Sequence, residues 1–218
     1  MRTLELTEGY IHDCLSEASQ LPSARGDFRS LFPDPPRPAA VLVPLLRTSS
    51  TGRDSDTWHL LLTRRSDTLE EHRGQVAFPG GQAHEEDPSP VVTALRETQE
   101  EIGLDPNSVR ILGQLNSFLT ITNYHVTPIV GVIPWPFPVS LAEHEVSRVF
   151  TIPLEWLAEP ANHEVRQRVI PPPYSTMLHT ESYPVIYFHP YDGEILWGVS
   201  AEITMSLLRA IIKKETGG

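Results

Sequence analysis

The stretch FPGGQAHEEDPSPVVTALRETQEEIGL, residues 78–104, decides the fold, because its second half predicts one well-bounded helix. Ser89 is placed to cap the helix start, and Pro90 suits the first helical position. Gly103 can end the helix in the left-handed conformation. Five residues form a stripe that can be buried on one side: Val91, Ala94, Leu95, Thr98 and Ile102.

The same helix carries three carboxylates that share one patch. Glu97, Glu100 and Glu101 fall within a sector of about 100° as i, i+3 and i+4 neighbours. Like charges at this spacing repel by roughly 0.2–0.5 kcal/mol per pair. The patch is therefore either a solvated acidic face, with Arg96 paired to Glu100, or a site for a hard divalent cation such as Mg²⁺ or Mn²⁺.

A glycine pair upstream favours the metal site. Gly80 and Gly81 let the backbone approach a ligand or metal closely, and Pro79 stiffens that approach. Together with the Arg-Glu-x-x-Glu-Glu-x-Gly pattern of residues 96–103, this loop resembles the Nudix box of pyrophosphohydrolases. The resemblance implies an α/β fold, specifically a Nudix-like α/β/α sandwich with a mixed sheet, and a metal-dependent hydrolase.

Motifs before the box resemble the coenzyme A branch of that family. Residues 61–66 read Leu-Leu-Thr-Arg-Arg-Ser, and residues 74–81 read Gly-Gln-Val-Ala-Phe-Pro-Gly-Gly, in the branch's spacing. Asp87, where glutamate is usual, and a loop one residue longer before Arg96 also look like this branch. Glu70 departs from it, because the branch pattern has arginine at that position.

The resemblance implies roles for the residues of the box. Glu97 and Glu101 are expected to ligate Mg²⁺ or Mn²⁺, with Glu100 as a further ligand. The Gly81 carbonyl is expected to contribute from the loop, and Gly80 to bring the backbone to the substrate.

The general base stays open between three glutamates. Glu100 lies in the box, whereas Glu143 and Glu145 lie in a late loop of the kind from which such enzymes supply a base or a further ligand. A solvated acidic turn is the alternative for this loop. Arg96 is expected to fix the helix carboxylates in place.

Coenzyme A or an acyl derivative is the substrate that the branch resemblance implies, cut to 4′-phosphopantetheine and 3′-phosphoadenosine 5′-phosphate. Arg65 and Arg73 are then candidates for the 3′-phosphate, as charge-assisted donors. Surface ion pairs are the alternative for both. Other substrates in view are ADP-ribose, NADH and dinucleoside polyphosphates. A non-catalytic nucleotide sensor is a reading of another class, disfavoured by the complete set of box residues.

Composition excludes several partners. The chain has 28 Asp and Glu against 17 Lys and Arg, and its net charge of −11 argues against nucleic-acid and anionic-membrane binding. The single cysteine, Cys14, cannot form an intrachain disulfide, and no apolar run reaches transmembrane length. We expect a cytoplasmic protein.

The chain divides into an N-terminal extension, residues 1–38, and a domain, residues 39–218. Residues 3–20 predict an amphipathic helix, with Thr7 as its cap, that packs outside the core or at the contact of a homodimer. Strands are expected over 39–46, 58–63, 75–78, 109–115, 126–133, 146–152 and 185–189. Residues 47–57 should form a loop and 153–158 a short helix.

Two single residues carry further predictions about these elements. Pro128 is expected to mark an edge or a bulge in the strand over residues 126–133. Ser200 is expected to cap a terminal helix whose buried side includes Ile203, Leu207, Leu208 and Ile211.

Overall fold

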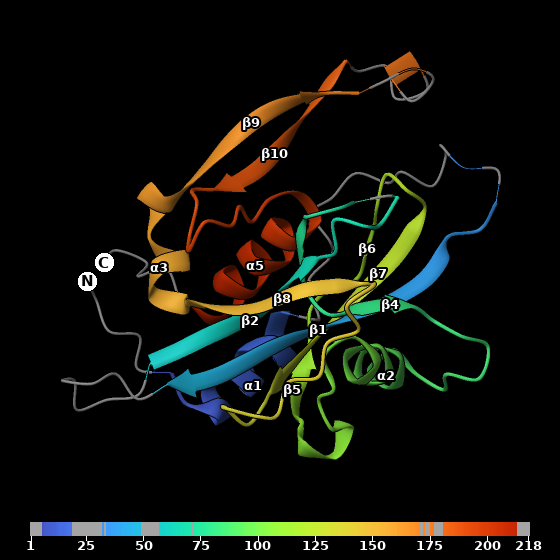
Figure 1. Cartoon of the computed structure of the whole chain (residues 1–218). Coiled ribbons are helices and arrows are strands. Elements are labelled where there is room, and N and C mark those ends of the chain that lie inside the picture. The colour runs from blue at the N-terminus through green and yellow to red at the C-terminus, as the bar shows by residue number, and fades with distance from the viewer. Residues whose placement is uncertain are drawn as a thin grey trace.

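The computed structural model describes residues 6–18, 32, 34–48, 57–70, 72–170, 172, 175–176 and 181–212. Within these residues the chain forms an eight-stranded mixed sheet with helices on both faces and a separate hairpin (Figure 1). The α/β prediction is therefore confirmed. Residues 49–56, most of the loop expected over 47–57, lie outside the described part.

The sheet is built around β1 (Arg37–Thr48), which pairs antiparallel with β2 (Thr57–Arg65) and parallel with β7 (Tyr124–Val132). The central order is β3-β2-β1-β7-β5. The other strands of this sheet are β3 (Val76–Ala77), β4 (Gly80–Gln82), β5 (Arg110–Gln114), β6 (Phe118–Leu119) and β8 (Val146–Pro153). One parallel pair among antiparallel pairs makes the sheet mixed.

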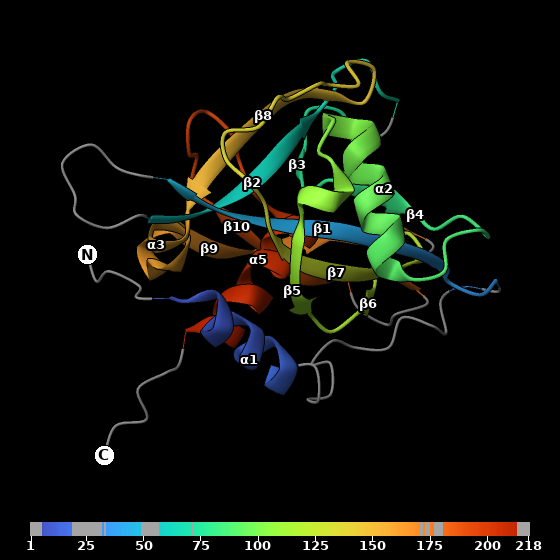
Figure 2. The ribbon, with the colours of Figure 1, turned by 90° about the horizontal axis from the view of Figure 1, so that it is seen from below.

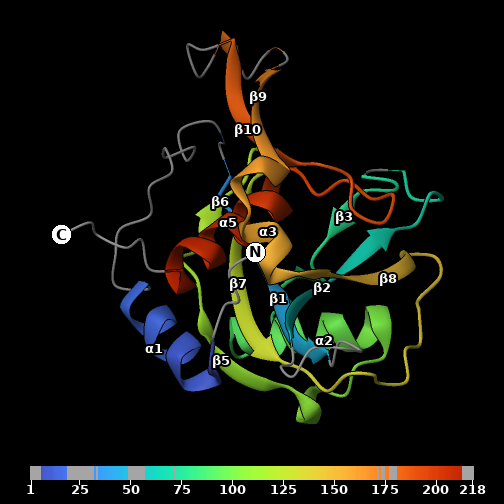
Figure 3. The same ribbon diagram turned by 90° about the vertical axis from the view of Figure 1, so that its left-hand side faces the viewer.

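Alternating side chains of β1 fill two cores. Val43 and Leu45 point to the face covered by α1 (Glu8–Ala18) and α5 (Gly198–Ile211), whereas Leu42 and Leu46 point to the face covered by α2 (Pro90–Ile102). Figures 2 and 3 show these helices on opposite sides of the sheet. Because successive strand residues face opposite ways, an apolar run such as residues 39–46 indicates a strand buried on both faces.

The N-terminal helix belongs to the core, so the expectation that it packs outside the core is wrong. Ile11 and Leu15 are buried in the same cluster as the α5 side chains, and the Trp58 indole N–H donates to the Leu6 carbonyl at 2.8 Å. Thr7 caps the helix as predicted, since the Tyr10 amide donates to its hydroxyl.

Long-range pairing decides two further predictions. Pro128 does not mark an edge, because β7 has partners on both sides. It does lie at an irregularity, as the bulge alternative has it, because residues 115–117 stand opposite only Thr127 and Pro128 where the partner changes from β6 to β5. Ser200 does not cap α5, which begins at Gly198 after Trp197. Instead its buried hydroxyl donates to the Val76 carbonyl at 3.1 Å and ties α5 to β3.

A two-stranded hairpin stands apart from the main sheet. It is formed by β9 (His163–Val169), which the sequence did not predict, and β10 (Ser182–Phe188). Figure 1 shows it above the body, next to α5. The remaining short elements are η2 (Pro106–Ser108), α3 (Leu154–Ala158) and η3 (Pro160–Asn162).

Candidate active site

The predicted boundaries of α2 are confirmed. The Val92 amide donates to the Ser89 hydroxyl at 3.4 Å, Pro90 is the first helical residue, and Gly103 has φ of 74°. Ala94, Thr98 and Ile102 are buried against β1 and its neighbours. This packing fixes the rotation of the helix and thereby the direction in which its carboxylates point.

The three carboxylates of α2 run from solvent into the protein. The Glu100 side chain is 59% exposed and the Glu97 side chain 16%, whereas Glu101 as a residue is only 4% exposed. Glu101 Oε2 is buried without a hydrogen-bond partner among the described residues. A simple solvated acidic face does not account for this arrangement, because a lone buried carboxylate oxygen is costly.

The glycine loop lies directly against the carboxylates. Gly81 pairs with Ala40 of β1, and a Cβ on Gly81 would lie 2.4 Å from Glu97 Oε2. A Cβ on Gly80, whose φ is 150°, would lie 2.4 Å from the Ala40 carbonyl oxygen. The first glycine therefore permits close packing on β1, and the second leaves room for the Glu97 carboxylate.

Arg96 connects the loop to the helix. Its Nη2 donates to Asp87 Oδ2 at 3.0 Å and to the Gln82 carbonyl at 3.2 Å, and its Nη1 lies 2.9 Å from Glu97 and 3.1 Å from Glu100. Asp87 also accepts from the Thr93 hydroxyl and the His84 amide. Arg96 thus links Asp87 and the loop carbonyl to two carboxylates of α2.

The holding role of Asp87 was not predicted. From the sequence, Asp87 is only one of the features that resemble the coenzyme A branch. Its place two residues before the helix cap was the available signal, since a carboxylate there can reach side chains in the first turns. Its hydrogen bonds from Arg96 and from the His84 amide hold the pKa of this carboxyl well below its usual range.

Burial is the largest cause of the pKa shifts of the two inner carboxylates, Glu97 and Glu101. It raises the pKa of Glu101 to about 8, with Arg65 opposing the shift and the charges of Glu145 and Glu97 adding to it. Burial also raises the pKa of Glu97, against the hydrogen bond from Arg96. A cation placed between these groups would relieve both the desolvation and the mutual repulsion.

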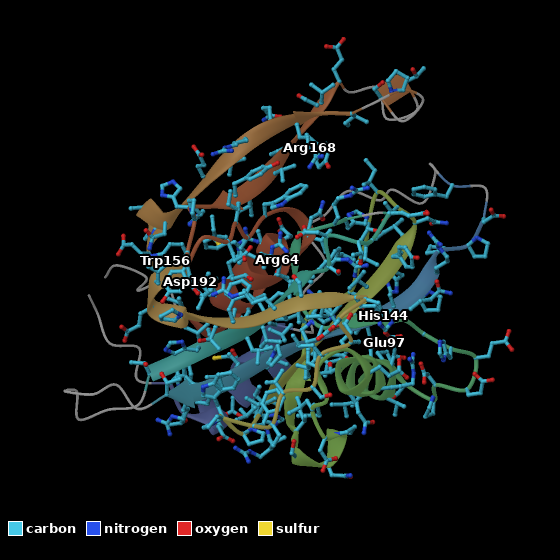
Figure 4. All side chains as sticks on the ribbon, in the orientation of Figure 1. Arg64, Glu97, His144, Trp156, Arg168 and Asp192 are labelled. Atoms are coloured by element: carbon cyan, nitrogen blue, oxygen red, sulfur yellow. The ribbon has the colours of Figure 1, made fainter. Side chains whose placement is uncertain are left out.

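The late loop docks on the end of α2. Ser140 and Ala142 donate their amides to the carbonyls of Ile102 and Glu101, both at 3.0 Å. The next turn, residues 143–145, brings Glu145 close enough for its charge to raise the pKa of both Glu97 and Glu101. Glu143 is exposed on the same turn. Figure 4 labels Glu97 on α2 and His144 between the two glutamates of the turn.

The structure separates the two arginines assigned to one phosphate. Arg65 is partly buried, its charge acts on Glu101, and its Nε has no hydrogen-bond partner among the described residues. Arg73 instead lines a second pocket together with Arg64 and Trp197. The backbones of the two segments are neighbours, since the Gly74 amide donates to the Arg65 carbonyl at 3.2 Å, but Arg65 is not among the residues that line this pocket.

The carboxylate site fits a divalent cation that takes few protein ligands. Among the described residues, no group of three or more His, Cys, Asp or Glu side chains is arranged to hold a metal ion. Mg²⁺ suits such a place, because it is commonly held by one or two carboxylates while waters and substrate phosphates fill its other positions. Glu101, with its unpartnered buried oxygen, and Glu97, seated on Gly81, are the two carboxylates in position.

The chain is similar in sequence to known proteins. A family model described as NUDIX domain matches residues 36–173. A protein named uncharacterized Nudix hydrolase NudL from Escherichia coli O7:K1 is 39% identical over 171 residues, which are 78% of this chain and 81% of that protein. A protein of the same name from Yersinia pestis is 38% identical over 177 residues, 80% of each chain.

A solved structure supports the fold alone. The MutT/nudix family protein from Enterococcus faecalis has a TM-score of 0.50 and 16% identity, covering 94% of this chain and 72% of that one. In the described part of the chain, no helix is both long and apolar enough to cross a membrane.

Proposed function

The chain belongs to the Nudix hydrolase family, and we propose that it is a Mg²⁺- or Mn²⁺-dependent pyrophosphohydrolase of coenzyme A or acyl-coenzyme A. The observation that carries the hydrolase proposal is the buried, unpartnered Glu101 oxygen beside Glu97 and the Gly81 cradle. The substrate assignment rests on residues 61–66 and 74–81, whose spacing resembles the coenzyme A branch. We place this activity in the cytoplasm.

The protein holds the reacting diphosphate through the residues of the box. Glu101 and Glu97 are the proposed metal ligands, with the Gly81 carbonyl as a further oxygen donor. The side chain of Glu100, which the sequence also offers as a ligand, is 59% exposed and bound to Arg96. When bound, the cation neutralises phosphate oxygens and lowers the pKa of water. Arg96 keeps Glu97 and Glu100 in place through its bonds to Asp87.

Arg65 is assigned to the diphosphate itself. Its charge already acts on Glu101, and a guanidinium with an unused buried N–H is a strong donor to phosphate oxygens. In this role Arg65 offsets the negative charge that grows on the phosphate as the linkage breaks.

Glu145 is the proposed general base. Its charge raises the pKa of both Glu97 and Glu101, and its carboxylate lies 3.0 Å from His144. The Glu100 carboxylate is instead bound by Arg96, and Glu143 is exposed. Glu145 takes a proton from water, and the water oxygen bonds to phosphorus. The P–O bond of the anhydride breaks, and the two products are 4′-phosphopantetheine, or its acyl form, and 3′-phosphoadenosine 5′-phosphate.

Parallel hydrolysis assays test the substrate. Coenzyme A, dephospho-coenzyme A and ADP-ribose are compared at equal Mg²⁺, with products separated by chromatography. We expect the highest kcat/KM for coenzyme A. If dephospho-coenzyme A and ADP-ribose are cut equally fast, the coenzyme A assignment is wrong, and the enzyme is a pyrophosphohydrolase of broader or different nucleotide specificity.

A further inference from the structure

An open pocket lies between the turn that precedes β3 and the segment that leads into α5. Its volume is about 540 Å³. Its lining comes from two stretches and the end of β2: Arg64, Arg73, Gly74, Gln75, Gly193, Glu194, Ile195 and Trp197. None of these residues is a carboxylate of the box, and Figure 4 shows Arg64 well apart from Glu97.

Arg64, one of the two arginines in this pocket, is fully engaged. Its guanidinium donates twice to Asp67 at 2.9 Å and once to the Ser147 hydroxyl at 3.0 Å, and it lies 3.5 Å from Glu194. Glu194 is itself shared with Arg148 at 3.4 Å. Arg64 and Glu194 therefore already have charged partners at one side of the pocket.

Arg73 is the cation that remains available. Within the described residues it has neither a hydrogen bond nor an ion pair, and its charge is felt by Asp67, which is already bound to Arg64. β2 ends at Arg65, and Arg73 lies in the connection of residues 66–75 that follows it. The Arg65 guanidinium thus lies near the carboxylates of α2, whereas Arg73 lines the pocket.

An aromatic wall completes the pocket. Trp197 stacks on Tyr187 of β10 with ring centroids 5.3 Å apart and planes 4° apart, and the Arg168 guanidinium lies 4.6 Å from the Trp197 ring centroid. Figure 4 shows Arg168 on the hairpin above the body. The Trp197 ring is therefore already in contact with Tyr187 and Arg168, which hold it in place beside the pocket. Gln75 and the available Arg73 guanidinium are the polar groups of the lining that can bind a phosphate.

We propose that this pocket receives the adenosine 3′-phosphate end of the substrate, with Arg73 binding the 3′-phosphate and Trp197 lying beside the base. The inference rests on the proposed function and sharpens it. Arg65 acts at the diphosphate, where the reaction occurs, and Arg73 determines specificity for the phosphate that distinguishes coenzyme A from dephospho-coenzyme A.

The test is the Arg73→Ala variant of the full chain, assayed with Mg²⁺ on coenzyme A and dephospho-coenzyme A. A lost charge-assisted hydrogen bond should lower kcat/KM for coenzyme A by about 10- to 100-fold. The value for dephospho-coenzyme A should not change, so the preference should disappear. Arg73→Lys should retain part of it. Arg209→Ala, which removes an exposed guanidinium from α5, is the matched control. An equal effect on both substrates, or on neither, would overturn the proposal.

Calorimetric binding separates this inference from the proposed function. Wild-type protein should bind 3′-phosphoadenosine 5′-phosphate more tightly than AMP, and Arg73→Ala should bind both alike. This result would support the pocket even if coenzyme A were not hydrolysed, which would overturn only the proposed reaction. Equal binding of the two nucleotides by the wild-type protein would overturn the pocket assignment.

Discussion

Gly81 touches the Glu97 carboxylate so closely that no larger residue fits without moving it. The Cβ of an alanine would lie 2.4 Å from Glu97 Oε2, well inside van der Waals contact. We predict that Gly81→Ala displaces this carboxylate and weakens Mn²⁺ binding, measured by electron paramagnetic resonance, by about 10-fold or more.

Gly9→Ala is the matched control for this substitution. Gly9 lies in α1 and has no atom within 4 Å of an added Cβ, so alanine there should leave metal binding unchanged and stabilise the helix by up to about 1 kcal/mol. Unchanged Mn²⁺ affinity in Gly81→Ala would show that the loop does not shape the metal site.

Local signals in the sequence determine α2, and they were therefore predictable. Ser89, Pro90 and Gly103 act on the helix that they bound, and the spacing of the carboxylates follows from helical geometry. β9 shows no pattern of alternating apolar residues that would predict a strand, because almost all its residues are exposed. Its partner strand, β10, follows only after residues 170–181. Ser200 was misassigned because its partner, Val76, is 124 positions away in the chain.

The sequence groups the three carboxylates of the proposed site, but it does not show how deeply each is buried. Helical spacing groups Glu97, Glu100 and Glu101, yet only packing against β1 and the late loop shows that Glu101 is the buried one. Likewise, Arg73 lines a pocket with Trp197, from a distant part of the chain, whereas Arg65 does not. Both features arise from tertiary contacts that no local pattern encodes.

The hydrogen bond from Ser200 of α5 to Val76 of β3 leads to a prediction about how α5 is held to the sheet. Ser200→Ala leaves the Val76 carbonyl without its hydroxyl donor, and the free energy of unfolding should fall by about 1–2 kcal/mol. Urea denaturation measures this change. Ser206→Ala, on the same helix but only partly buried, should be nearly neutral. Equal effects of the two substitutions would mean that the hydrogen bond does not anchor α5.

At the scale of the whole molecule, the N-terminal helix is part of the folded domain. Ile11 is fully buried among side chains of α5 and the sheet. Ile11→Ala should therefore reduce the free energy of unfolding by about 2–5 kcal/mol, measured by chemical denaturation. Asp13→Ala, exposed on the same helix, should change it by less than about 0.5 kcal/mol. A neutral Ile11→Ala would support a separable extension over residues 1–38.

The central claim is that the buried carboxylate of α2 holds the catalytic metal. Glu101→Gln keeps the shape of the side chain and removes its charge, whereas Glu159→Gln changes an exposed residue beside α3, on the other side of the molecule (Figure 1). The decisive measurement is kcat/KM for coenzyme A against Mg²⁺ and Mn²⁺ concentration in both variants. We predict a loss of more than about 100-fold for Glu101→Gln, since even residues that only orient metal ligands cost 10- to 100-fold, and no loss for the control. Metal-dependent turnover near the wild-type rate in Glu101→Gln would contradict the claim.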